Sequence, residues 1–373
     1  MKHFSMPADF RNETIDRYER INRTYADAKV LNTYGNITIR NVFGSGRNVD
    51  KLPPVDLERL AAYIAYSRAR GIDFAYTLNP SFLDNREFTP GGIREIRRFL
   101  DELYAAGVRT LIVALPSVME IVRAQGDRFR IKASAICQIT SANKALLFKK
   151  MGADAMVVDE TINRDFHTLR RIREAFGPEV YVILNSFCHQ DCQYRMFHYN
   201  QISGDSVAVS SPASCAYYPV RCAARLHEDL TNYLKTTWVR PEDLRHYLAA
   251  GIEHFKLQGR QLVLRGDPAR AVECYIRESY DGDLKHLLYL FAPADIVRAA
   301  VDNRKLDGFL QPFVDTEGFC RRDCTQCDYC GEFARRCFDA DGEAAARAHA
   351  GFLRSQDPFA GALRAAAEGG QTR

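Results

Sequence analysis

The sequence predicts an α/β protein whose main domain is a (β/α)8 TIM-like barrel, followed by a C-terminal cysteine-rich helical and loop extension. Short β-rich runs alternate with helical patterns from about residue 29 to residue 265. Such alternation requires right-handed crossovers and a parallel sheet. Roughly eight strand signals in about 240 residues fit a closed barrel better than an open sheet. Polar residues also follow six of the expected strand ends, as they do at the mouth of a barrel enzyme.

The first half of the chain shows the alternation clearly. A first strand is expected at residues 30–34 or 37–43, and a helix at 57–70 follows two prolines and ends at Gly71. Further strands are expected at 73–78, 110–115, 130–134, 155–158 and 180–184. The helices between them are expected at 92–106, 118–124, 141–151 and 165–176. Glycines close several of these helices, which is the usual C-terminal signal.

The second half is less regular. Residues 185–235 are expected to form a long irregular stretch, residues 238–239 a strand end, 241–250 a helix, 253–257 a strand and 267–280 a helix. The domains expected are therefore an N-terminal helical segment (1–28), the barrel (29–281), a cysteine-rich extension (282–339) and a helical or disordered tail (340–373).

Composition is that of a globular protein. Hydrophobic residues make up 46% and charged residues 26%, and the net charge is only +4 over 373 residues. Charge therefore gives no indication of a nucleic-acid partner. The N-terminus lacks the apolar core of a signal peptide, and the longest apolar stretch, residues 111–122, is too short to span a bilayer. We expect a cytoplasmic protein without a membrane partner.

The last cysteine group has the densest spacing. Its four thiols are separated by three, two and two residues, at Cys320, Cys324, Cys327 and Cys330. In a reducing compartment, clustered cysteines more often bind metal than form disulfides. Zinc and a 4Fe–4S cluster are both candidates. One compact loop favours the cluster, and Cys337 is an alternative ligand.

A second cysteine group lies in the centre of the chain. Cys188 and Cys192 directly follow the strand expected at 180–184, and Cys215 and Cys222 lie downstream. The spacing alone is a weaker pattern than that of the last group. Its position in the longest irregular segment strengthens it, because long loops inside compact domains are usually functional. His189 and His198 are alternative ligands, although each is more simply a hydrogen-bonding loop histidine. Cys137 and Cys274 are expected to be buried, inert thiols.

The expected strand ends place several other candidates at one mouth. They are Asn79, Ser134, Asp159, Glu160, Asn185, Arg240, Gln258 and Arg260. The alternative is that these strand ends simply meet polar loops. The segment Gly44-Ser-Gly46-Arg47 opens no expected helix at nucleotide-binding spacing, so a loop is expected there. No nucleophile elbow with a Ser-His-Asp set is present in the sequence.

Several segments together resemble the collagenase-like U-32 peptidase family. They are Trp238-Val-Arg240-Pro241-Glu242-Asp243-Leu, Gly251-Ile-Glu-His-Phe-Lys256-Leu-Gln258-Gly259-Arg260, Val158-Asp-Glu160, and the run from Asn185 through Cys188, Cys192 and Arg195 to His198-Tyr. The resemblance spans residues 30–265. The sequence departs from the pattern in its cysteine spacing, and in Gln258, which stands where the family has Glu. The C-terminal cysteine group, Cys320 to Cys330, is extra to those relatives.

The resemblance implies a barrel-like fold and a four-cysteine 4Fe–4S site held by Cys188, Cys192, Cys215 and Cys222. The better understood relatives are oxygen-independent hydroxylases of ubiquinone biosynthesis and RNA modification, some with prephenate as oxygen donor. We therefore expect an iron–sulfur oxidoreductase that acts on a small molecule or a modified biopolymer, with two 4Fe–4S clusters. A related subunit or electron donor is an expected partner.

Roles for the other candidates follow from their chemistry. Arg240, Lys256 and Arg260 are expected to clamp a carboxylate such as a prephenate-like donor. Asp159 and Glu160 are candidate acid–base groups, and Asn185 a hydrogen-bond donor. Structural ion pairs, such as Glu160 with Arg260 or Lys256, are the alternative. Two other functions stay open: a U-32-type peptidase, and a non-catalytic iron–sulfur subunit of a heteromeric enzyme.

Overall fold

Eight parallel strands form a closed barrel in this computed structural model, which describes residues 1–206, 217–293 and 299–369. Each strand pairs in parallel with the next along the chain, and β8 pairs with β1 to close the ring. The strands are β1 (Lys2–Pro7), β2 (Ala28–Gly35), β3 (Asp73–Leu78), β4 (Thr110–Val113), β5 (Arg130–Ala133), β6 (Ala155–Val157), β7 (Val180–Ile183) and β8 (His254–Lys256). The expected (β/α)8 TIM-like barrel is confirmed.

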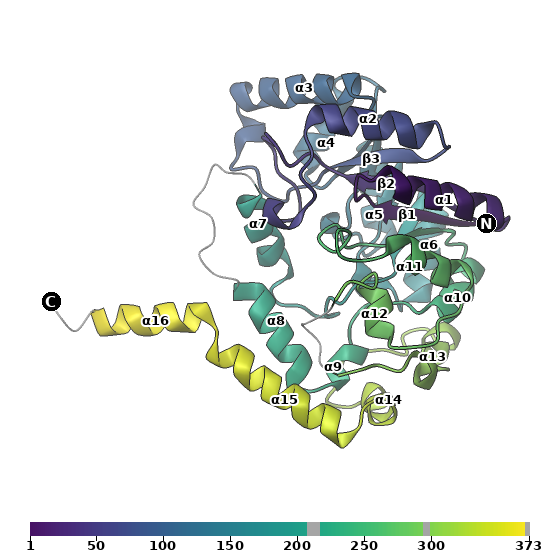
Figure 1. Cartoon of the computed structure of the whole chain (residues 1–373), viewed down its shortest axis with the longest axis vertical. Coiled ribbons are helices and arrows are strands. Elements are labelled where there is room, and N and C mark those ends of the chain that lie inside the picture. The colour runs from purple at the N-terminus through teal and green to yellow at the C-terminus, as the bar shows by residue number, and fades with distance from the viewer. Residues whose placement is uncertain (207–216, 294–298, 370–373) are drawn as a thin grey trace.

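Helices in the connections surround the strands (Figure 1). They are α1 (Asn12–Thr24), α2 (Leu57–Arg68), α3 (Pro90–Ala105), α4 (Pro116–Arg123), α5 (Ala142–Lys150), α6 (Phe166–Phe176), α10 (Leu244–Ala249) and α11 (Pro268–Ile276). Helix α3 shows why they form. The Thr89 side chain accepts a hydrogen bond from the Gly92 N–H, Pro90 occupies the first turn, and the apolar face buries Ile96 and Leu100.

The N-terminal boundary expected from the sequence is wrong. Residues 1–28 are not a helical segment outside the barrel, because they contain β1, which pairs with both β2 and β8. Phe4 and Met6 are fully buried apolar residues, while Lys2, His3 and Ser5 of the same strand are polar. This strand is six residues long and is flanked by charges, so its alternation of polar and apolar residues gives only a weak signal.

Two further expectations change in the second half of the barrel. Residues 238–239 form no strand; the Val239 N–H only donates to the Leu184 carbonyl, 2.8 Å away, just past β7. The stretch expected to be irregular contains α7 (Arg195–Asp205), α8 (Tyr217–Glu228) and α9 (Thr231–Leu234). Helix α8 packs against α15 (Ala340–Ser355), which lies beside it in Figure 1. Packing against a distant segment stabilises this helix, and local sequence patterns cannot report such packing.

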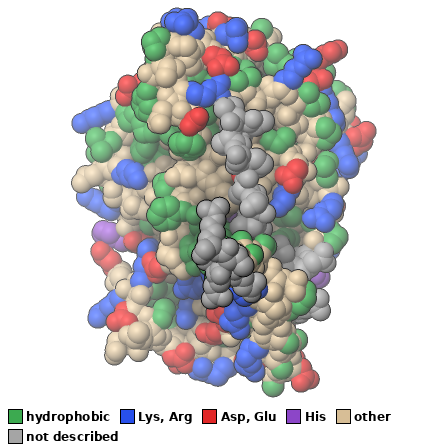
Figure 2. All heavy atoms as spheres, turned by 90° about the vertical axis from the view of Figure 1, so that its left-hand side faces the viewer, with side chains coloured by type: hydrophobic (Ala, Val, Ile, Leu, Met, Phe, Trp, Pro, Cys, Tyr) green, Lys and Arg blue, Asp and Glu red, His purple; other side chains and the backbone are tan. Residues whose placement is uncertain are grey.

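The C-terminal extension is mostly helical. It contains α12 (Leu284–Leu288), α13 (Gln311–Asp315), α14 (Tyr329–Cys337) and α15, and it ends with α16 (Pro358–Gly369). Arg221 of α8 forms an ion pair with Asp357 (2.8 Å), which joins the tail to the barrel side. Basic and acidic side chains are interspersed on the face shown in Figure 2. Among the described residues, no helix has the length and apolar character needed to cross a membrane.

Candidate functional site

The carboxyl ends of the strands converge on a small polar pocket of about 50 Å³, here called the barrel mouth. Six of the residues expected at strand ends or in the clamp line it: Asn79, Ser134, Glu160, Lys256, Gln258 and Arg260. Tyr34 and Arg47 join them. Asn79 connects two loops of the mouth, because its side chain donates to Ser134 (3.3 Å) and accepts from the Gly46 N–H (3.2 Å).

Positive charge dominates the barrel mouth. The Arg260 guanidinium is buried and donates to Thr77 (2.7 Å) and to Asn36. Burial, followed by the nearby charge of Arg47, lowers the pKa of Arg260 to about 9. The Lys256 ammonium lies 4.1 Å from the centre of the Tyr34 ring, and in the described structure it has no carboxylate partner. Burial, followed by the neighbouring Lys132, brings the pKa of Lys256 well below its usual range.

An anion bound between these groups would relieve the cost of burying uncompensated cations. The electrostatics of the mouth are therefore suited to a ligand that carries a carboxylate or a phosphate. A guanidinium and an ammonium together offer several charge-assisted donors to such a group.

The acidic pair at the end of β6 is bound to a cation from α7. The Arg195 guanidinium lies 2.6 Å from the Glu160 carboxylate and 3.3 Å from that of Asp159. Glu160 therefore does not pair with Lys256 or Arg260, which was the alternative raised by the sequence. Asp159 also accepts from the Thr161 N–H (2.8 Å) and does not line the mouth. Burial, followed by the charge of Glu160, raises the pKa of Asp159.

Asn185 and Arg240 have structural surroundings. The Asn185 amide donates to the Gln258 and Leu288 carbonyls (2.8 and 3.0 Å) and accepts from the Gln258 N–H, so it joins β7 to the segment after β8. Arg240 pairs with Asp243 (3.1 Å) and Asp307 (2.9 Å), away from the mouth. The expected clamp thus keeps Lys256 and Arg260 and loses Arg240, because the strand end expected at 238–239 does not exist.

Three of the four central cysteines line one pocket of about 230 Å³, here called the central cysteine pocket. Cys188 and Cys192 follow β7, and Cys222 reaches the pocket from α8. Cys215 lies outside the described residues. Burial, then the charge of Glu160, raises the pKa of the Cys188 thiol to about 12, and burial raises that of Cys222 to about 11. A thiol with such a raised pKa stays protonated unless a strongly bound metal cation takes its thiolate form as a ligand.

The central cysteine pocket adjoins the barrel mouth. Tyr199, Gln258 and Gly259 line both of them. The rest of the cysteine pocket is largely aromatic and apolar, with Phe187 and Tyr289 in its wall 5.0 Å apart between ring centres. His198 also lines it, and burial lowers its pKa to about 4. Thiols in an apolar pocket therefore lie next to a cationic pocket at the carboxyl end of the barrel.

The four C-terminal cysteines line a separate and larger pocket of about 430 Å³, here called the outer cysteine pocket. Cys320, Cys324 and Cys327 are exposed, and Cys330 is half-buried at the start of α14. Cys337 is buried at the other end of α14 and does not line this pocket. The structure thus brings together the four cysteines that the sequence grouped, and it leaves the alternative ligand out.

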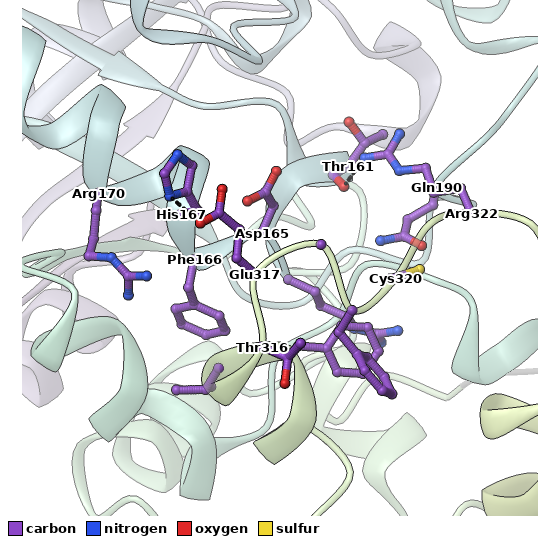
Figure 3. A pocket seen from close by; sticks show the side chains of 15 residues that line it. Thr161, Asp165, Phe166, His167, Arg170, Gln190, Thr316, Glu317, Cys320 and Arg322 are labelled. Carbon is purple, nitrogen blue, oxygen red and sulfur yellow. Dashed lines mark hydrogen bonds and ion pairs between the residues drawn. The ribbon is translucent and has the colours of Figure 1, made fainter.

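The loop that carries the outer cysteines touches the central loop. Arg322 donates to the Thr161 carbonyl (3.0 Å), beside Glu160, and pairs with Asp191 (3.2 Å), between Cys188 and Cys192. Figure 3 shows the hollow of about 70 Å³ at this junction, with Cys320, Arg322 and Thr161 around it. His167 and Glu317 approach to 3.2 Å across the same hollow. The two cysteine pockets therefore belong to one connected assembly.

The donor set decides which metal group suits these pockets. All the cysteines among the described residues are free thiols. Within the described ranges, no three His, Cys, Asp or Glu side chains are gathered tightly enough for one metal ion. A single zinc ion draws four ligands into a small tetrahedron, whereas a four-iron cluster accepts thiolates spaced more widely around it. The thiol donors of both pockets are of the type that holds a four-iron cluster.

Three residues of the site were missed by sequence reasoning. Arg47 lies in the loop after β2 and donates to Gln258 (3.3 Å), while Arg195 and Tyr199 come from α7. The glycines before Arg47 were a usable signal, because Gly46 packs so closely that a Cβ there would lie 2.8 Å from Ile136. No local pattern indicated that α7 would cross the barrel mouth.

Comparison with known proteins identifies relatives. Residues 51–174 match the family described as Peptidase family U32. An uncharacterized protease of Methanocaldococcus jannaschii is 28% identical over 294 residues, which cover 79% of this chain and 85% of that protein. The solved structure of the U32 peptidase Mk0906 has the same fold, with a TM-score of 0.51 at 19% identity over 69% of this chain and 92% of its own. The chain is thus similar to peptidase family U32 over residues 51–174, and to the protease from Methanocaldococcus jannaschii over most of its length.

Proposed function

We propose that this protein is an iron–sulfur oxidoreductase that hydroxylates an anionic substrate without molecular oxygen, using an organic oxygen donor. The observation that carries this proposal is the junction of the central cysteine pocket with the cationic barrel mouth through Tyr199, Gln258 and Gly259. Cys188, Cys192, Cys215 and Cys222 would hold one 4Fe–4S cluster, and the four outer cysteines a second. A bound cluster would supply one-electron chemistry and a Lewis-acidic iron beside the mouth.

The net reaction balances with a donor that carries a hydroxyl group. The substrate R–H and the donor D–OH give R–OH and D–H, so the substrate loses two electrons and the donor gains them. No other oxidant is required. A prephenate-like donor has the necessary hydroxyl and carboxylates, and it is our first candidate.

The chain's own residues would bind and orient these molecules. Lys256, Arg260 and Arg47 offer the donors for carboxylate groups. Glu160 faces the same pocket and would accept or return a proton, while its pairing with Arg195 fixes its position. The small size of the mouth would exclude water around the reacting groups.

A peptidase is the second candidate, because the relatives carry that name. A cysteine peptidase needs a thiolate beside a base, but burial raises the pKa of Cys188 to about 12 and lowers that of His189 to about 4. The oxidoreductase fits these two residues better, although the names of the relatives favour the peptidase.

Anaerobic purification distinguishes the two. We expect roughly eight irons and eight sulfides per chain, a brown protein, and transfer of labelled oxygen from a donor such as prephenate into a product. If the purified protein contains no iron, and cleavage of casein or gelatin co-purifies with it, the protein is a peptidase and the proposal is wrong. A related chain that co-purifies and alone restores turnover would instead make this chain a non-catalytic subunit.

A further inference from the structure

A second polar pocket, of about 290 Å³, lies at the opposite end of the barrel from the mouth. The first residues of several strands line it, among them Asp73 of β3, Thr110 of β4, Arg130 of β5 and Ala155 of β6. We call it the N-terminal pocket, after the strand ends that form it. It shares no lining residue with the mouth or the cysteine pockets.

Lys132 is the central feature of the N-terminal pocket. Its side chain comes from the middle of β5 and is 3% exposed. The ammonium lies 3.6 Å from the centre of the Tyr181 ring, and in the described part of the chain no carboxylate pairs with it. A buried ammonium without a counter-charge is costly, and a cation–π contact offsets only part of that cost.

The acidic groups of the pocket are already engaged elsewhere. Asp73 lies 3.8 Å from Arg68, outside the pocket, and Glu179 lies 3.7 Å from Arg130, a second cation of the same pocket, so neither forms an ion pair with Lys132 in the described structure. Lys29 adds a further positive charge at the exposed rim. The pocket therefore has space, an unmatched buried amine and an excess of positive charge.

We propose that the N-terminal pocket binds a small anion, a carboxylate or a phosphate, with Lys132 as its counter-ion. The Lys132 amine would donate to the anion from the pocket floor. Tyr181 would cover the side of the amine, and the exposed Lys29 would attract the anion to the rim. This site is independent of the proposed function, because it involves none of the cysteines and none of the mouth residues.

The pH dependence of binding follows from the state of Lys132. Burial lowers its pKa to about 7, with Glu179 opposing and Arg130 adding to the shift. The anion binds the protonated amine, so affinity is full below pH 7 and falls as the pH rises above it. Binding itself raises the pKa and takes up a proton. The other charged or titratable groups around Lys132 are Lys29, Asp73, Tyr181, His254 and Lys256.

Site-resolved acetylation tests the proposal on the full chain prepared without oxygen. A pulse of acetic anhydride near pH 6, where the anion binds most tightly, is followed by mass spectrometry, with malonate, inorganic phosphate or chloride present at equal ionic strength. We expect malonate or phosphate to slow acetylation of Lys132 about tenfold, because below the pKa of the amine a rise of one pKa unit lowers the free amine about tenfold. Chloride and the exposed Lys150, which lies outside the pocket, serve as controls, and the effective anion identifies the ligand as a carboxylate or a phosphate.

Calorimetry on variants gives the second measurement. Lys132→Met keeps the length of the side chain, and we expect it to fold and to lose the binding heat that falls off above pH 7. Lys256→Met in the mouth should keep that heat. The proposal is overturned if neither malonate nor phosphate slows acetylation of Lys132 more than chloride does. It is also overturned if Lys132 does not react at all. Binding heat that persists in Lys132→Met but disappears in Lys256→Met also overturns it.

Discussion

The two cysteine groups differ most in their surroundings. The central group lies in an aromatic pocket against the barrel mouth, and burial raises the thiol pKa of Cys188 and Cys222 to about 12 and 11. The outer group stands on a loop whose first three cysteines are exposed. Cysteine therefore occurs in two different environments in this chain, one beside a small cationic pocket and one open to solvent.

We propose different roles for the two groups. Redox chemistry on a substrate requires a site that excludes water and binds the substrate. Among the described residues, the central group adjoins the mouth at the strand ends, whereas the outer group adjoins the hollow at the junction of the two loops. An exposed cluster is suited to exchange electrons with a partner or to order the extension around it. Arg322 connects the two loops, so a change at the outer group has a physical route to the inner one.

Removing a central ligand is expected to have the largest effect. Cys188→Ser should lose about half of the iron and nearly all hydroxylation, because three thiolates hold a cluster weakly and the mouth loses its reactive neighbour. Cys327→Ser should also lose about half of the iron but keep activity with a small chemical reductant. Iron, sulfide and turnover are measured on both variants. If Cys188→Ser and Cys327→Ser lose activity equally, the two cysteine groups do not have different roles.

Alkylation of the metal-free protein should separate the groups by thiol reactivity. The thiolate is the reactive form, so Cys188, with a pKa of about 12, should react with iodoacetamide at neutral pH on the order of a thousandfold more slowly than an exposed thiol. Cys320, Cys324 and Cys327 are the exposed reference. Mass spectrometry at timed intervals gives each rate. Comparable rates would mean that the central cysteine pocket opens freely without metal.

Basic side chains of the barrel mouth should contribute to turnover, whereas basic side chains near the outer cysteines should not. Lys256→Met is expected to lower kcat/KM roughly 10- to 100-fold, as loss of one charge-assisted hydrogen bond to a carboxylate predicts. Cluster content and stability should not fall, since the change removes an unmatched buried amine. Arg321→Met, beside the outer cysteines, is the matched control and should leave kcat/KM unchanged. Steady-state kinetics with a series of donors that lack one carboxylate would show which group Lys256 binds.

The sequence predicted the barrel, seven of its eight strands within two residues (β2 as one of two alternatives), and both cysteine groups, because these depend on local periodicity and spacing. It missed β1, whose inward residues are polar, and it proposed a strand at 238–239 that does not form. That one error also misplaced Arg240. The contribution of α7 to the mouth could not be predicted, since the positions of Arg195 and Tyr199 depend on how a helix after β7 crosses the barrel end.

The smallest expected effect lies at the connection between the groups. Arg322 and Asp191 are both partly exposed, so Arg322→Ala should change the free energy of unfolding by only about 1 kcal/mol or less. Amide exchange should nevertheless quicken across residues 320–328, because the guanidinium also holds the loop to the Thr161 carbonyl. Arg321→Ala is the control, since it removes a neighbouring arginine without touching either partner. Exchange that stays slow in Arg322→Ala would mean that the metal group alone orders the outer loop, and the two cysteine pockets would then act independently.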